Sequence, residues 1–165
     1  MTHSSILYCK AFESTIVDLS ERYRFQIQKV ENSERIPGSF WGDDEAGLIG
    51  NNLFIKELTP LHSAFHEICH YICMDSNRRQ NLYRDAKSSI IEENGVCYLQ
   101  ILLSKYYSPI GEKRMQHDMD KWGYSFRFGS AKAWFENDAS DAFDWLYRHK
   151  IIYKSGGLTW NLRKN

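Results

Sequence analysis

Excess charge of either sign, proline and long apolar runs are all scarce in this chain of 165 residues. Basic and acidic residues number 21 each, so the formal net charge is zero. That balance provides no electrostatic footprint for nucleic acid or an anionic membrane surface. No run approaches the ~18 apolar residues of a transmembrane helix. Residues 1–19 lack the basic start and apolar stretch of a signal peptide, so none is expected.

Only three prolines are present, and no internal repeat, low-complexity tract or linker divides the sequence. We therefore expect one domain over residues 1–165, which is long enough to bury a substantial core. The four cysteines, at positions 9, 69, 73 and 97, do not resemble a small disulfide scaffold. Cys69 and Cys73 are expected on one helix, at a spacing poorly suited to a disulfide. These features predict buried, reduced thiols and a cytoplasmic protein.

The spacing of apolar residues predicts a helix-rich chain with few strands. Helical spacing covers residues 5–22, 60–74, 88–106, 109–122, 131–135 and 139–150. Alternating apolar and polar residues predict one strand around Phe25 and Ile27, and Leu48–Leu58 is predicted to be a second. Thr59 and Pro60 suit the N-cap and the first helical position of the helix that follows.

Polar segments separate these elements. Residues 31–47 contain turn formers and acids, and Asp43, Asp44 and Glu45 are expected in a solvated acidic turn. Residues 75–87 are predicted to form a polar loop with a helical turn. The glycine-punctuated tail over residues 155–165 leaves room for one short strand.

The most informative motif is His66-Glu67-Ile68-Cys69-His70, an H-E-x-x-H string on the predicted helix 60–74. Chance would produce about 0.014 such strings in a chain of this composition, so accident is a poor explanation. Histidines at i and i+4 lie on one helical face, about 5–6 Å apart at Cβ, and both can bind one tetrahedral Zn²⁺. Glu67 can then serve as general base toward a metal-bound water.

A catalytic zinc site usually has three protein ligands, so one more is required. Glu92 and Glu93 begin an otherwise apolar predicted helix, and a buried carboxylate there needs a partner such as a metal ion. Glu93 shares a helical face with the polar Gln100, whereas Glu92 shares one with Val96. This favours Glu93 as the third ligand, with Glu92 kept as the alternative.

Taken together, these residues resemble the gluzincin metallopeptidases, and more closely the ImmA/IrrE-type metallopeptidases of bacteria. The resemblance covers about residues 48–104, from the predicted second strand through the motif helix to the helix begun by Glu92 and Glu93. It implies an α+β, helix-dominated, zincin-like fold with a small N-terminal sheet packed on the motif helix. It also implies Zn²⁺ as cofactor and hydrolysis of a peptide or protein substrate.

Several finer expectations follow. In zincins an edge strand pairs with the substrate backbone, and residues 50–53 are predicted to provide that edge. A donor for the oxyanion is expected from Tyr124, His117, Arg127 or His149. His62 continues the i, i+4 ladder of His66 and His70, and it is expected to be an exposed residue near the helix start rather than an alternative or supporting metal ligand. The alternative to an enzyme is a catalytically weak zinc-binding regulator or adaptor.

Overall fold

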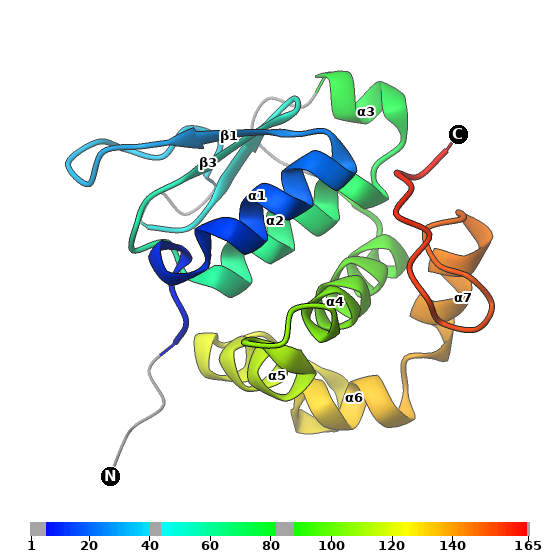
Figure 1. Cartoon of the computed structure of the whole chain (residues 1–165). Helices are drawn as coiled ribbons and strands as arrows, with labels where there is room; N and C mark the ends of the chain where they lie inside the picture. Colours follow the sequence, from blue (N-terminus) through cyan, green and yellow to red (C-terminus); the bar gives the residue numbers. More distant parts are fainter. Residues whose placement is uncertain (1–5, 40–43, 82–87, 165) are drawn as a thin grey trace, which may run out of the picture.

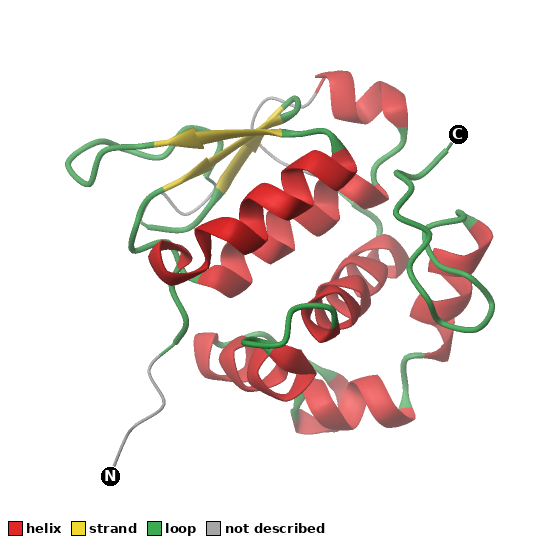
Figure 2. Cartoon of the chain, in the orientation of Figure 1, coloured by secondary structure: helices red, strands yellow, loops and turns green. Residues whose placement is uncertain are grey.

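The computed structural model describes residues 6–39, 44–81 and 88–164, and within them the chain is helix-dominated α+β (Figure 1). A small sheet lies over helices α1 and α2, and helices α4 to α7 lie on the other side of α2 (Figure 2). The strands are β1 (Gln26–Lys29), β2 (Gly47–Ile49) and β3 (Asn52–Ile55). The α-helices are α1 (Glu13–Tyr23), α2 (Leu61–Cys73), α3 (Ser76–Asn81), α4 (Ile90–Lys105), α5 (Gly111–Trp122), α6 (Ala131–Asn137) and α7 (Ser140–Arg148). Short 3₁₀ turns are η1 (Cys9–Phe12) and η2 (Arg127–Gly129).

The sheet has the order β1-β3-β2, with β1 parallel and β2 antiparallel to the central strand β3. The prediction of one strand over Leu48–Leu58 was therefore wrong, because this segment folds into a hairpin. Gly50 forms the turn with a φ of +58°, a left-handed conformation that glycine adopts at little cost. The predicted edge at residues 50–53 was also wrong: these residues form the turn and the start of the central strand. The edge strand of the hairpin is β2.

The first helix and strand start later than the spacing predicts. Residue 5 lies outside the described residues, and the segment before α1 forms η1. Helix α1 ends at Arg24, which has a φ of 62° and donates its backbone N–H to the carbonyl of Ser20. Because of this left-handed residue, the alternation around Phe25 becomes a strand only from Gln26 onward.

Helix α2 matches the predicted helix 60–74 closely, but its expected cap was wrong. Pro60 occupies the N-cap position and Leu61 is the first helical residue. The hydroxyl of Thr59 instead accepts a hydrogen bond from the backbone N–H of Lys56 at 2.8 Å. Thr59 therefore closes the turn between β3 and α2 and leaves the helix without a side-chain cap.

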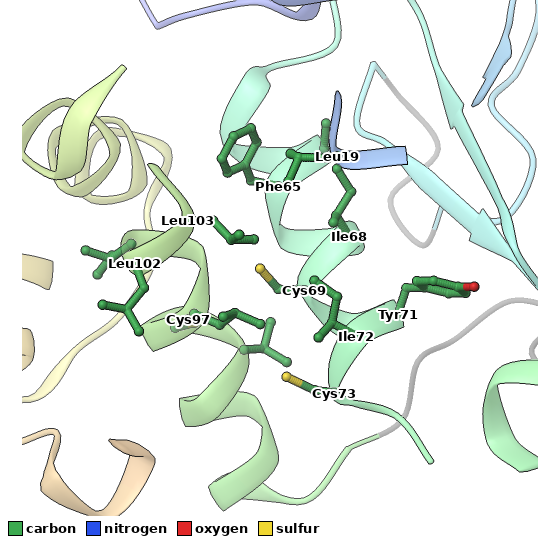
Figure 3. Packing of buried hydrophobic residues seen from close by; sticks show 14 of the residues in the cluster. Leu19, Phe65, Ile68, Cys69, Tyr71, Ile72, Cys73, Cys97, Leu102 and Leu103 are labelled. Carbon is green, nitrogen blue, oxygen red and sulfur yellow. The ribbon is translucent and has the colours of Figure 1, made fainter. Parts of the chain in front are cut away.

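Helices α2 and α4 form the centre of the core, and their apolar side chains interdigitate (Figure 3). Phe65, Ile68 and Ile72 of α2 are fully buried, as is Leu103 of α4. Helix α7 packs closely on α4 at Gly95, where an added Cβ would lie 2.8 Å from Cε3 of Trp145. The four cysteines at positions 9, 69, 73 and 97 are free and buried, which confirms the predicted packing of Cys69 and Cys73.

The C-terminal third is helical, as predicted, and its tail docks against α2. The backbone N–H of Arg163 donates to the carbonyl of Ile72 at 2.9 Å. Among the described residues of the tail, the predicted strand is only an isolated bridge between Ile152 and Leu158. Helix α3 supplies the helical turn expected in residues 75–87, of which 82–87 lie outside the description. In the described ranges, every helix is too short or too polar to cross a membrane.

Candidate metal centre

Helix α2 is open to solvent only at the motif. Eleven of its thirteen residues are buried, and the two exceptions are His66 and Glu67. His66 and His70 stand one turn apart on the same face, so their Nε2 atoms approach to 3.2 Å. The other faces of α2 are buried in the core. The helix therefore holds the two imidazole nitrogens close together at its solvent-facing side.

The third group comes from the first turn of α4. Glu93 Oε1 lies 3.0 Å from His66 Nε2, and Glu93 Oε2 lies 3.2 Å from His70 Nε2. The ligand atoms of these three residues all lie within 4.8 Å of one another. Ser89 caps α4 by accepting the backbone N–H of Glu92, and Ser88 donates to Glu93 Oε2 at 2.9 Å. The three side chains form a group that could hold a metal ion.

The pKa shifts of the group favour a proton shared between His66 and Glu93, with His70 neutral. Burial opposes charge on His66, but Tyr124, Cys97 and Glu93 together raise its pKa well above the ordinary value. Burial also opposes charge on Glu93, yet its hydrogen bond to His66 and the nearby imidazoles lower its pKa to about 2. Burial and then His66 lower the pKa of His70 to about 3. A proton held between His66 and Glu93 therefore occupies the place where a cation would bind.

A second layer of contacts orients His66. Its Nδ1 lies 3.0 Å from Oε1 of Gln100, and Nε2 of Gln100 donates to the carbonyl of His62 at 2.8 Å. Gln100 is completely buried, on the same face of α4 as Glu93. His70 differs, because its buried Nδ1 has no hydrogen-bond partner among the described residues.

Glu92, the alternative third ligand, lies in a different cluster. Its carboxylate is 3% exposed, and both of its oxygens accept hydrogen bonds from Nη1 of Arg78, at 3.0 and 2.8 Å. Arg163 Nη1 approaches the same carboxylate at 3.8 Å. The buried carboxylate of Glu92 is therefore paired with arginine. Because Glu93 lies beside both histidines instead, the geometry favours Glu93 as the metal ligand.

A cleft of about 610 Å³ opens in front of the group. It is lined by Glu45, Ala46, His62, Ser63, His66, Glu67, Glu93, Trp122, Gly123 and Tyr124. Glu67 thus lines the same cleft as His66 and Glu93. His62, which also lines the cleft, is buried, whereas the prediction was that it would be exposed. It is buried because α5 and the segment after it cover the start of α2.

Of the four candidates for the oxyanion donor, only Tyr124 lines the cleft. Its ring stands edge-on to His66 at 5.5 Å, and its hydroxyl lies 3.2 Å from Nδ1 of His62. The others have partners elsewhere: His117 pairs with Asp118, Arg127 pairs with Asp138, and the ring of His149 packs at a tilt against Trp145. No sequence signal distinguished Tyr124, because it reaches the site through the turn that follows α5.

The sequence also concealed two residues of the cleft rim. Glu45, expected in a solvated turn, lines the cleft and accepts a hydrogen bond from the indole N–H of Trp122 at 2.9 Å. Asp44 of the same predicted turn is exposed and pairs with Lys56, and Asp43 lies outside the described residues. Glu45 and Trp122 are 77 positions apart, so no local pattern could have paired them.

No protein-family model, curated protein or solved structure matches this chain.

Proposed function

We propose that this protein is a zinc-dependent hydrolase, a peptidase of gluzincin type with a zincin-like fold. The convergence of His66, His70 and Glu93 beside an open cleft, which His66, Glu93 and Glu67 line, carries the proposal. Two histidines and a glutamate suit a catalytic zinc ion, and three protein ligands leave one coordination position for water. The cleft volume is in the range of small-molecule and peptide sites.

The side chains of the cleft match the proton transfers of peptide hydrolysis. Zinc, when bound, would lower the pKa of a coordinated water and polarise a carbonyl. Glu67, on the open side of α2, would accept a proton from the attacking water and deliver it to the leaving amine. Burial raises the pKa of Tyr124 to about 12, so its hydroxyl stays protonated at neutral pH and can donate to an oxyanion.

Metal content is the first test. Purified protein should contain or take up about one zinc ion per chain, and His66→Ala should lose it. Because His66 is partly exposed, the variant should keep its fold, which circular dichroism checks. Wild-type protein that stays metal-free in excess zinc would contradict the proposal.

Peptide hydrolysis is the second test. Glu67→Gln should reduce the rate of cleavage of a mixed peptide library by about 10²-fold or more. Zinc should stay bound, because Glu67 is not a ligand. Full activity in Glu67→Gln would contradict the mechanism. Stoichiometric zinc in a wild-type protein that cleaves no peptide would support a regulator or adaptor instead.

A further inference from the structure

The rim of the cleft contains a carboxylate and an indole ring side by side. Glu45 and Trp122 both line the cleft, and the indole Nε1 donates to Glu45 Oε1 at 2.9 Å. Glu45 is half-buried, whereas Trp122 is 44% exposed. The pair joins the segment before β2 to the end of α5 across the opening in front of the metal ligands.

Each half of the pair is held in place by its own contacts. The backbone N–H of Ala46, next to Glu45, donates to the buried hydroxyl of Ser63 on α2 at 3.0 Å. The ring of Trp122 packs on His62 with centroids 5.1 Å apart, and α5 ends directly after it at Gly123. Gly123 has a φ of 103°, which a larger side chain would rarely adopt, so the chain turns sharply there. The two side chains are therefore positioned by the fold.

The carboxylate of Glu45 has no role in the proposed hydrolysis. The cleft is lined by Glu45, Glu67 and Glu93, and no lysine or arginine lies among its described lining residues. Glu93 is assigned to the metal and Glu67 to proton transfer. The indole N–H is a neutral donor, so it orients the carboxylate of Glu45 without cancelling its charge.

We propose that Glu45 and Trp122 form a subsite for a cationic group of the substrate, an ammonium or a guanidinium. A carboxylate provides an ion pair, and the exposed face of an indole attracts the same cation through its ring electrons. The inference rests on the proposed function, because it concerns the substrate of that cleft. The cation has two sources, a lysine or arginine side chain or a free α-amino group.

Binding of small probes tests the subsite without requiring turnover. Three probes of similar size are titrated into zinc-loaded protein by calorimetry: N-acetyl-lysine methylamide, norleucine methylamide and N-acetyl-norleucine methylamide. The first has a side-chain cation, the second an α-ammonium and the third no charge. We expect one cationic probe to bind about tenfold more tightly than the neutral probe, and the preferred probe identifies the source.

Variants assign the preference to the rim. Glu45→Gln should remove the difference between charged and neutral probes, and Trp122→Leu should reduce it, with zinc content unchanged in both. Glu136→Gln is the matched control, since it removes an exposed acid on α6 outside the cleft, and it should keep the preference. Equal binding of all three probes, or a preference that survives in Glu45→Gln, would overturn the subsite.

Peptide turnover separates this inference from the proposed function. A protein that cleaves cationic and neutral peptides with equal kcat/KM, before and after Glu45→Gln, is a peptidase without this subsite. A protein that cleaves no peptide but binds a cationic probe through Glu45 retains the subsite and loses the proposed activity.

Discussion

The side-chain amide of Gln100 holds a proton on Nδ1 of His66, because both ends of the amide are hydrogen-bonded. Because Nε2 of Gln100 donates to the carbonyl of His62, its oxygen faces Nδ1 of His66 and must accept a hydrogen bond there. His66 therefore keeps a proton on Nδ1, and the second proton, which its Nε2 shares with Glu93 in the metal-free protein, is the one that a metal ion would displace. Loss of that second proton leaves the tautomer that a metal ligand requires, since the nitrogen that binds the ion must be unprotonated.

Gln100→Leu should weaken zinc binding although it removes no ligand. Loss of the orienting hydrogen bond typically costs 10–100-fold in metal affinity, and we expect a decrease of about that size. Competition against a chromophoric chelator measures it. Gln100→Glu retains an acceptor for His66 and should lose less. An affinity equal to wild type in Gln100→Leu would exclude the orienting role.

The two adjacent glutamates of α4 should behave differently. Glu93→Ala should lose zinc, because it removes one of three ligands. Glu92→Gln should keep zinc but lower the free energy of unfolding by about 1–3 kcal/mol, because the charged hydrogen bonds to Arg78 are weakened. Metal analysis and urea unfolding of both variants provide the comparison. Loss of zinc in Glu92→Gln with retention in Glu93→Ala would reverse the assignment.

Stability of the metal-free protein should fall in mild acid because of His62. Burial lowers the pKa of His62 from 6.5 to about 4, so above pH 6.5 it is neutral in both folded and unfolded chains. Below pH 6.5 the imidazole of His62 binds a proton in the unfolded chain, whereas in the folded chain it stays neutral down to about pH 4. The free energy of unfolding should therefore decrease by up to about 3 kcal/mol across this interval. Urea unfolding at several pH values measures the slope.

A variant without the imidazole isolates this contribution. His62→Phe should show a shallower loss of stability between pH 6.5 and 4, although other buried groups such as His70 still contribute. Identical slopes for the variant and wild type would assign the acid sensitivity to other residues.

Gly95→Ala should destabilise the protein despite the higher helix propensity of alanine. The added methyl group would lie 2.8 Å from the ring of Trp145, so α7 would have to shift away from α4. Overpacking costs about 1–3 kcal/mol, which exceeds the ~1 kcal/mol gained in propensity. Thermal unfolding checks the sign. In a Trp145→Leu background the same substitution should be better tolerated; an equal cost there would mean that the ring is not the obstacle.

The local patterns of this sequence predicted the elements that local interactions decide. Helix α2 was predicted within one residue at each end, and α4 within two residues. The hairpin was missed because the apolar residues on both sides of Gly50 and Asn51 were assigned to one strand, although this turn-forming pair between two short apolar stretches favours a hairpin. The pairing of β1 with β3 likewise depends on contacts across more than twenty residues.

The candidate site divides in the same way. His66, Glu67 and His70 were predicted because one helix places them together, and Glu93 because it shares a helical face with polar residues. Glu45 comes from the segment before β2, whereas Trp122 and Tyr124 come from the end of α5, so their meeting beside α2 is a property of the packed chain. Gln100 lies two turns from Glu93, a spacing that predicts a shared face but no role.

The buried thiols have a consequence for how strongly a metal ion would stabilise the protein. Cys69, Cys73 and Cys97 are packed between α2 and α4 in the folded chain, where burial raises the pKa of Cys69 and Cys73. Unfolding exposes them, and a thiolate is a strong zinc ligand. The denatured chain would therefore compete for the ion, and added zinc would raise the melting temperature less than the affinity of the native site implies.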